Sequence, residues 1–272
     1  MPELPEVETV TTELRNHILG KRFTDVHINR YKLRITIPAF LSELVNNQKI
    51  TKIQRQAKYI LIYLDNEYVL VLHLGMSGKI LINPKEPSRK HDHVIFTLNN
   101  NHKIIFNDPR RFGLVTIIHN LDLAHSKLFA KLGPEPLSSE FNSRYLLNAI
   151  KKRVMPIKTT IMNNQVVVGV GNIYACESLF RCGISPLRKA NTLTVKEAEK
   201  LVVAIQQTLQ DAITAGGSSL KDYVNTSGDA GYFQNNLRVY GKANQLCDVC
   251  NTIITNIRQS GRSTFYCYTC QC

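Results

Sequence analysis

The pattern of apolar and polar positions changes character twice along the chain. Over residues 3–18, Val7, Val10, Leu14 and Ile18 recur at spacings of three and four, and Gly20 follows as a stop. This spacing predicts an amphipathic helix at the start of the chain.

From about residue 23 to residue 118 the period shortens. Segments rich in β-branched and aromatic residues alternate with turn residues: FTDVHI, KITKIQ, YILIYL, YVLVLHL, KILI, HVIFTL, KIIF and LVTII. Many short strands at regular spacing are typical of a β-sandwich or a barrel.

Helical periodicity returns after the GPEPL segment at 133–137, over 140–151, 171–182 and 194–215. The two glycines at 216–217 end the last of these helices, and a loop rich in Gly, Ser, Asn and Asp runs to about 236. We therefore expect an α+β protein in three parts: a helix and β-sandwich over 1–132, a helical block with this loop over 133–236, and a small cysteine-bearing module over 237–272.

Charge narrows the range of partners. Thirty-four Lys and Arg face 21 Asp and Glu, a formal net charge of +13, which indicates a polyanion such as nucleic acid. Charge alone leaves DNA, RNA, an anionic membrane surface or a merely basic enzyme open. No apolar run approaches the roughly 20 residues that span a bilayer, and the opening MPELPEVETV lacks the apolar core of a secretory signal. We expect a cytoplasmic protein.

Five of the seven cysteines lie in the last 26 residues. Cys247-x-x-Cys250 and Cys267-x-x-Cys270 are two knuckles at a spacing typical of a four-thiolate zinc site. The intervening TIITNIRQSGRSTFYC predicts a hairpin with a Ser-Gly turn. A module of this size needs the metal to fold, so we expect one structural zinc ion and no organic cofactor, with Cys272 a frayed end outside the ligand set.

The N-terminus is a candidate nucleophile. A small second residue normally allows removal of Met1, which would leave Pro2 with a secondary amine. An α-amino group has a pKa of about 8, against about 10.4 for lysine, so more of it is unprotonated at neutral pH. Attack on a sugar carbon would expel a base and leave an iminium that favours β-elimination. Glu3 and Glu6 stand beside it as candidate proton carriers; the alternative is that they only match the helix dipole.

These residues fall in motifs that resemble formamidopyrimidine-DNA glycosylase, a bacterial family. The motifs occur in the same order over nearly the whole chain: PELPEVET (2–9), RQAKYILI (55–62), HLGMSG (73–78), KHDH (90–93), DPRRFG (108–113), LGPEPL (132–137), VVGVGNIYACESLF (167–180), GGSSLKDY (216–223) and the CxxC pair. The sister enzyme endonuclease VIII resembles the chain less, since it opens PEGPE and lacks the DPRRFG loop.

The resemblance implies a β-sandwich domain, a helix–two-turns–helix domain and a zinc finger. It also implies a bifunctional glycosylase and AP lyase that excises oxidised purines from damaged duplex DNA as a monomer in the bacterial cytoplasm. Pro2 would attack C1′, Glu3 would carry protons, Lys58 would donate a proton in β-elimination, and Arg262 would assist δ-elimination.

The resemblance further implies residues that contact DNA. Met76, Arg110 and Phe112 would form a wedge that replaces the everted nucleotide, with Arg110 offering donors to the orphaned cytosine. Taken without the motif, Met76 and Phe112 would be ordinary core residues. Phosphates would be contacted by His91, Arg153, Lys158 and Asn172. Ser218 or Ser219, in the loop over the flipped base, would read the lesion.

Two other functions are compatible with part of the sequence. A related glycosylase acting on oxidised pyrimidines would use the same chemistry with another pocket. A zinc-ribbon DNA-binding protein without catalysis would account for the charge and the cysteines, but it leaves Pro2, Glu3 and Lys58 without a role.

Overall fold

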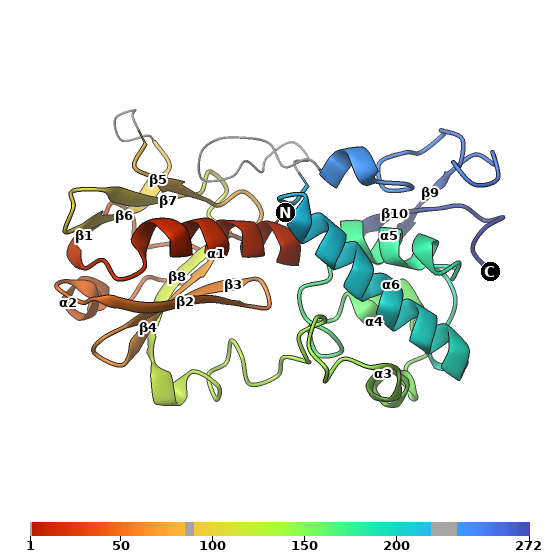
Figure 1. Cartoon of the computed structure of the whole chain (residues 1–272), viewed down its shortest axis with the longest axis horizontal. Coiled ribbons are helices and arrows are strands. Elements are labelled where there is room, and N and C mark those ends of the chain that lie inside the picture. The colour runs from red at the N-terminus through yellow and green to blue at the C-terminus, as the bar shows by residue number, and fades with distance from the viewer. Residues whose placement is uncertain (1, 85–89, 219–232) are drawn as a thin grey trace. The chain divides into compact units, whose positions relative to one another are not determined.

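The fold is that of a computed structural model, which describes residues 2–84, 90–218 and 233–272 (Figure 1). The chain divides into two compact units. The first contains residues 2–130 and 216–218 of the described chain, and the second contains 131–215 and 233–272. Among the described residues, none of the helices has the length and apolar character needed to cross a membrane.

The first unit is a β-sandwich of two antiparallel four-stranded sheets. One sheet has the order β1 (Phe23–Ile28), β6 (Asp92–Leu98), β7 (Lys103–Asn107) and β5 (Lys79–Ile82). The other has the order β2 (Ile50–Gln56), β3 (Tyr59–Leu64), β4 (Tyr68–His73) and β8 (Leu114–His119). All eight strands coincide within two residues with segments expected from the alternation of the sequence.

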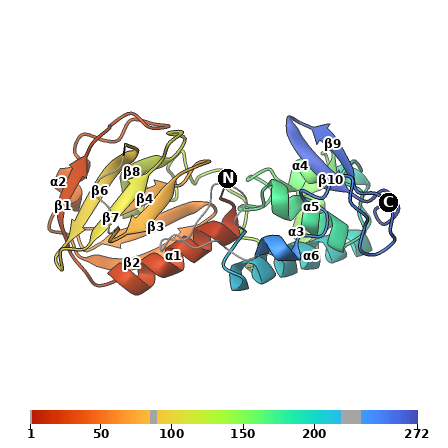
Figure 2. The same cartoon turned by 90° about the horizontal axis from the view of Figure 1, so that it is seen from above.

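Helix α1 (Leu4–Ile18) lies along the strands of this sandwich (Figures 1 and 2) and packs against β2, β3 and β5. Val7, Val10, Leu14 and Ile18 are buried in one cluster with residues of both sheets. Because its apolar side belongs to the core of the β-sandwich, α1 is fixed in its rotation about the helix axis, and its first turn is held in place.

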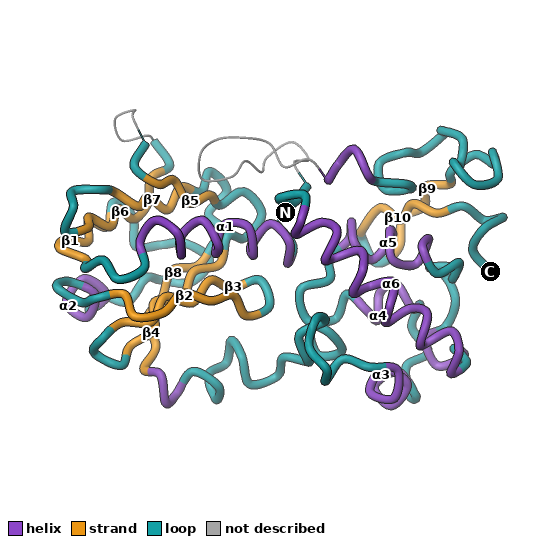
Figure 3. Tube along the Cα trace, in the orientation of Figure 1, coloured by secondary structure: helices purple, strands orange, loops and turns teal. Residues whose placement is uncertain are grey.

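The second unit combines helices with a hairpin (Figure 3). Its helices are α3 (Ser143–Ile150), α4 (Ile157–Ile161), α5 (Asn172–Arg181) and α6 (Val195–Thr214), and its strands are β9 (Thr255–Gln259) and β10 (Arg262–Tyr266). Thr194 and Glu197 form a capping box that starts α6 where the sequence predicts it. The expected α+β fold, with its sandwich, helical block and zinc hairpin, is confirmed.

The hairpin packs directly on the helical block. Cys176 and Phe180 of α5 share one apolar cluster with Val239, Cys247 and Ile254. The carboxylate of Glu177, also on α5, accepts the backbone N–H groups of residues 238, 239 and 240. The sequence-based division at residue 237 therefore separates two parts that form one compact unit, and residues 216–218 group with the sandwich instead of the helices.

Some features have no clear signal in the sequence. The five-residue helices α2 (Leu41–Val45) and α4 are too short to show a period. The expectation that Cys272 frays is wrong: its N–H donates to the Gly183 carbonyl (3.0 Å), and its carbonyl accepts from the Ser185 N–H (2.9 Å).

Candidate active site and zinc centre

Pro2 and Glu3 are both buried at the beginning of α1. Glu3 is the N-cap, and its N–H donates to Oε2 of Glu6 (2.8 Å). This hydrogen bond satisfies a backbone donor that the helix cannot. It also fixes the backbone directly after Pro2, so the candidate nucleophile is attached to a rigid element.

The other oxygen of Glu6 holds a segment more than 200 residues away in the chain. Its Oε1 accepts the N–H of Ser218 (2.8 Å), and a Cβ on Gly217 would lie only 3.1 Å from Cγ of Glu6. Gly217 has φ of +83°, a conformation that favours glycine. Since both Glu6 oxygens accept backbone hydrogen bonds, Glu6 joins α1 to residue 218.

Lys58 lies in the tight turn between β2 and β3, where Ala57 has φ of +53°. Its side chain is 9% exposed. Arg55 ties this turn to α1: Nε donates to Oε2 of Glu8 (2.7 Å), and Nη1 donates to the Ala57 carbonyl (2.9 Å). Because Arg55 is largely buried and bonds to both a carboxylate and a backbone carbonyl, it forms a rigid link between α1 and the turn. Arg55 is included in the RQAKYILI motif, but the sequence predicted no role for it.

His73, at the end of β4, is a second residue that the sequence left without a role. Its ring lies 4.8 Å from that of Tyr59, and its Nδ1 accepts the N–H of Gly75 (2.9 Å). Burial, together with the charges of Arg34 and Lys58, lowers the pKa of His73 to about 4. His73 is therefore neutral at pH 7, which leaves Nδ1 free of a proton and able to hold the turn before Met76.

The candidate wedge residues are exposed and do not belong to the core. Met76 is 36% exposed between a buried glycine and a buried serine, and Phe112 is 46% exposed. The Arg110 guanidinium lies 5.0 Å from the centre of the Phe112 ring, a stacked arrangement that suits contact with bases. All three side chains come from two loops of the sandwich, 74–78 and 108–113.

Lys158, for which the resemblance implies a phosphate contact, is bonded to several partners within the protein. It is 2% exposed, and its ammonium donates to Oδ1 of Asn172 (2.6 Å), Oγ1 of Thr264 (2.7 Å) and the Ser263 carbonyl (3.2 Å). It thereby joins α4, the start of α5 and strand β10. A phosphate contact by Lys158 stays a prediction, and the structure gives it the additional role of holding the hairpin on the helices.

Asn172 is the first residue of α5 and follows the N-cap Gly171. Its Nδ2 donates to the Ser263 carbonyl (2.9 Å), so the expected anion site would have to use the helix N–H groups. Arg153 is half-buried, and its Nε donates to the Ala149 carbonyl (3.0 Å) at the end of α3. Its phosphate contact also stays a prediction.

His91 lines a polar cavity of about 440 Å³ in the first unit, together with Arg30, Lys90, His93 and Arg111, among others. Arg30, Lys90 and Arg111 outnumber the one carboxyl group of this lining, that of Asp92, and an excess of positive charge suits an anion such as phosphate. Arg30 and Arg111, both exposed in the structure, are additional candidates. The sequence offers only their positive charge as a signal.

Arg262 is exposed at the start of β10, directly after Ser260 (φ +48°) and Gly261 (φ +78°). Positive φ at both turn positions is the geometry of a two-residue hairpin turn. Arg262 and Lys158 line the same cavity of about 250 Å³, beside Met155 and Met162. Of the candidate lesion-reading serines, Ser218 is buried and Ser219 lies outside the described residues.

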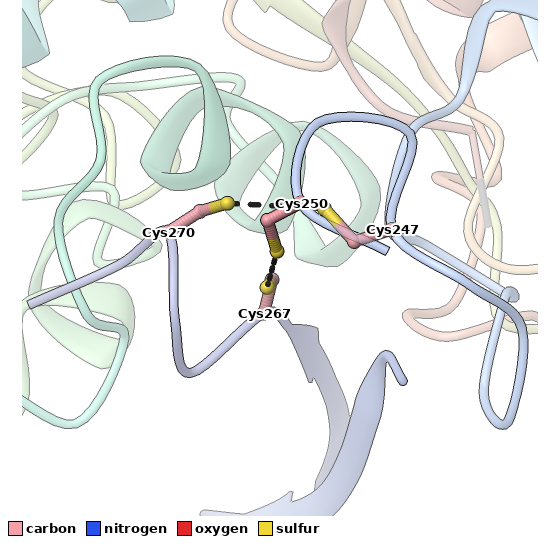
Figure 4. Close-up of side chains that lie close together, drawn as sticks. All are labelled: Cys247, Cys250, Cys267 and Cys270. Atoms are coloured by element: carbon pink, nitrogen blue, oxygen red, sulfur yellow. Dashed lines mark hydrogen bonds between the residues drawn. The ribbon is translucent and has the colours of Figure 1, made fainter. Parts of the chain in front are cut away.

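The four knuckle cysteines converge (Figure 4). Their Sγ atoms all lie within 4.8 Å of one another, with Cys247–Cys270 at 3.9 Å and Cys250–Cys267 at 3.4 Å. A tetrahedral zinc with Zn–S bonds of about 2.3 Å requires sulfur–sulfur distances of about 3.8 Å. The four thiols therefore fit one structural zinc ion, as expected.

Sequence comparisons agree with this arrangement. Family profiles match three segments: the formamidopyrimidine-DNA glycosylase N-terminal domain over 1–115, its H2TH domain over 132–224, and the zinc finger found in FPG and IleRS over 244–271. Formamidopyrimidine-DNA glycosylase of Wolbachia pipientis subsp. Culex pipiens (strain wPip) is 50% identical over 272 residues, with both chains fully covered.

Solved structures show the same fold over the full length. The MutM (Fpg) protein of Thermus thermophilus is 36% identical with a TM-score of 0.90, covering 99% of this chain and 98% of that one. Lactococcus lactis Fpg in complex with DNA containing an abasic site is 32% identical with a TM-score of 0.92, covering 99% of each chain.

The chain belongs to the formamidopyrimidine-DNA glycosylase family. The expected family, fold and enzyme class are thereby confirmed. The individual site residues stay predictions, and the geometry above is what supports them in this member of the family.

Zinc removal should affect the two units unequally. The ribbon shares its core with α5, so we expect chelation to weaken DNA binding and to loosen β9, β10 and the end of α5, while β2, β3 and β4 stay folded. Hydrogen exchange measured by mass spectrometry at increasing chelator concentration checks this. Cys272→Ser is the matched control, since that thiol is outside the cluster, whereas Cys247→Ser should mimic chelation. Equal loss of protection in β3 and β10 at one dose would contradict the prediction.

The half-buried His73, with its lowered pKa, predicts a component of acid instability. Its folded pKa of about 4 lies below the ordinary value of 6.5, so the unfolded chain takes up the proton first as pH falls. The contribution is complete above about pH 6.5 and is lost progressively down to about pH 4, by about 3 kcal/mol in total. His73→Asn keeps an acceptor for Gly75 without titrating, so its unfolding free energy should fall less over this range. The exposed His17→Asn should behave as the wild type; identical pH profiles for all three proteins would refute this assignment.

Proposed function

We propose that this chain is a bifunctional DNA glycosylase and AP lyase of base excision repair that removes oxidised purines, with the nitrogen of Pro2 as nucleophile. The observation that carries the proposal is the full-length match to the family together with a buried Pro2–Glu3 pair fixed at the start of α1. Placement on a helix that belongs to the sandwich core suits a group that must meet one atom of a substrate.

The first chemical step is an attack on C1′ of the damaged nucleotide. Removal of Met1 would free the Pro2 nitrogen, whose lone pair forms the N–C1′ bond as the bond to the base breaks. Glu3 supplies and accepts the protons that the leaving base and the sugar oxygen require. The attacking nitrogen then loses its proton, and its lone pair opens the sugar ring as the C1′–O4′ bond breaks and O4′ takes up a proton. The product is an iminium, which has no N–H to lose and stays cationic.

Strand cleavage follows from this cation. The iminium withdraws electrons from C2′, a C2′ proton is lost, and the 3′ phosphate leaves with Lys58 as the proton donor. The link from Glu8 through Arg55 to Ala57 holds the Lys58 turn against α1. Arg262 then assists loss of the 5′ phosphate by δ-elimination.

Access to C1′ requires that the nucleotide leave the base stack. Met76 and Phe112 would fill the vacated space, and Arg110 would donate hydrogen bonds to the unpaired cytosine. Their exposure and the stacking of Arg110 on Phe112 support this role. Ser218, anchored to Glu6, and Ser219 would read the everted base.

Affinity would come from phosphate contacts by His91, Arg153, Lys158 and Asn172, in line with the net charge of +13. A relative from Lactococcus lactis has been crystallised with DNA containing an abasic site. We propose that this chain binds damaged duplex DNA as a monomer in the bacterial cytoplasm.

Borohydride trapping tests the nucleophile. Reduction should lock the iminium as a covalent protein–DNA adduct on a duplex with 8-oxoguanine opposite cytosine. Pro2→Gly should lower the trapping rate at least about tenfold, because the secondary amine is replaced. Pro5→Ala, in the same first turn of α1, should trap at nearly the wild-type rate.

Two outcomes would refute the proposal in different ways. Full-rate incision by a protein whose mass shows that Met1 is retained would exclude Pro2 as the nucleophile. Faster processing of thymine glycol than of 8-oxoguanine would exclude the preference for purines.

The hairpin provides a test of the last step. Arg262→Ala should leave base removal within a few-fold of wild type, while the β-elimination product accumulates because δ-elimination slows about tenfold. Arg258→Ala is the matched control, since Arg258 is exposed and pairs with Ser263 on the neighbouring strand. Product analysis on denaturing gels separates the two 3′ ends; equal product ratios for both variants would remove Arg262 from this step.

A further inference from the structure

Asp108 is a completely buried carboxyl group at the end of β7, at the beginning of the 108–113 loop. Its Oδ1 accepts from the hydroxyl of Ser77 (2.6 Å) and from the N–H of Arg110 (3.2 Å), and its Oδ2 accepts from the N–H of Gly113 (2.7 Å). Ser77 belongs to the other wedge loop, 74–78. One side chain therefore connects the loop of Met76 to the loop of Arg110 and Phe112.

Both loops pass from one sheet of the sandwich to the other. The 74–78 loop leads from β4 to β5, and the 108–113 loop leads from β7 to β8. The N–H of Arg110 also lies 3.1 Å from the Ser77 hydroxyl oxygen, so Ser77 both donates to Asp108 and accepts from the wedge loop. The hydroxyl completes a closed set of three hydrogen bonds.

The two loops are also in direct backbone contact. A Cβ on Gly75 would lie 2.4 Å from the carbonyl carbon of Phe112, and a Cβ on Gly113 would lie 2.9 Å from the carbonyl oxygen of His73, directly before the 74–78 loop. Contacts this short exclude any side chain at either position. The glycines therefore allow the loops to approach closely enough for the Ser77–Asp108 hydrogen bond.

Asp108 is itself anchored to the strand behind it. Its N–H donates to the His91 carbonyl (3.0 Å), and its carbonyl is 2.8 Å from Nε2 of the buried His93. On the other side, His73 holds Gly75. Each loop is thus attached to a strand, and Asp108 attaches the loops to each other.

We propose that Asp108 is a positioning residue that makes Met76, Arg110 and Phe112 a single rigid wedge. The inference rests on the proposed wedge function of these three side chains. Insertion between stacked bases costs free energy, and the inserted side chains must keep their positions while the bases unstack. Two loops without a connection could each be displaced by the bases. The buried carboxylate of Asp108 bonds to both loops and thereby fixes them to the sandwich.

The inference separates base eversion from chemistry. The hydrogen-bond partners of Asp108 named above include none of the groups assigned to bond breaking, so its loss should slow the steps that need the wedge and spare those that do not. A lesion paired in a duplex needs eversion, whereas a preformed abasic site in single-stranded DNA has no partner to displace.

The test compares Asp108→Asn on these two substrates with the full chain. An amide in place of the carboxylate presents a donor to N–H or O–H groups, so at least one hydrogen bond is lost. We expect excision of 8-oxoguanine opposite cytosine to slow about tenfold or more, with cleavage of the single-stranded abasic site within about twofold of wild type. A 2-aminopurine beside the lesion should show slower and smaller unstacking.

Two further variants protect the test against a simple folding defect. Ser77→Ala removes only the link between the loops and should show the same selective defect, with a double variant no worse than Asp108→Asn alone. Asp92→Asn removes another buried carboxyl group of the sandwich, which accepts from Asn107 (2.7 Å). Its effect, whatever its size, should be equal on both substrates.

The outcomes distinguish this inference from the function on which it rests. If Asp108→Asn and Ser77→Ala slow both substrates equally, or neither, Asp108 does not position the wedge. If Asp108→Asn fails to fold, Ser77→Ala alone decides by the same comparison. Failure of the wild-type protein to form a borohydride adduct would instead refute the proposed function and leave the wedge geometry untouched.

Discussion

Buried carboxylates that accept backbone N–H groups hold the functional segments of this protein. Glu6 accepts from residues 3 and 218, Asp108 accepts from residues 110 and 113, and Glu177 accepts from residues 238, 239 and 240. In each case a rigid helix or strand end carries the acid, and an irregular segment supplies the donors. Such bonds are strong because the acceptor is a carboxyl group in a poorly solvated site. Irregular backbone can therefore carry the candidate chemistry without being disordered.

A second constraint keeps the zinc hairpin on the helices. The metal site alone would fold the hairpin but would not orient it. Lys158, with its three hydrogen bonds to Asn172, Ser263 and Thr264, and the apolar cluster on α5 supply the orientation. A buried ammonium is costly unless all its donors are used, so the pairing specifies one position of β10. Lys158 also bonds to the carbonyl of Ser263, the residue after the exposed Arg262, and so helps to set the position of Arg262.

The sequence was a good guide where the signal is local. Strand alternation predicted β3 and β6, spacing predicted α1 and α6, and the cysteine knuckles predicted the metal site. It was a poor guide where the signal depends on distant partners. Lys158 was expected only to contact phosphate, and its link to the hairpin depends on Thr264, 106 residues away. The proposed role of Asp108 depends on Ser77, 31 residues away. The sequence motifs include or adjoin Lys158 and Asp108, but they do not show which distant residues these two side chains contact.

The same distinction changes the meaning of the net charge. Of the basic residues discussed above, Arg55 is engaged by Glu8 and Ala57, Lys158 is buried, and Arg153 binds the end of α3. A cation committed to protein partners releases fewer counterions from DNA than an exposed one. The surplus of +13 therefore measures two things at once: a field that attracts DNA, and a set of internal links that shape the surface DNA meets. Arg262 illustrates both functions, since its own charge is exposed and the turn that carries it is held by buried neighbours.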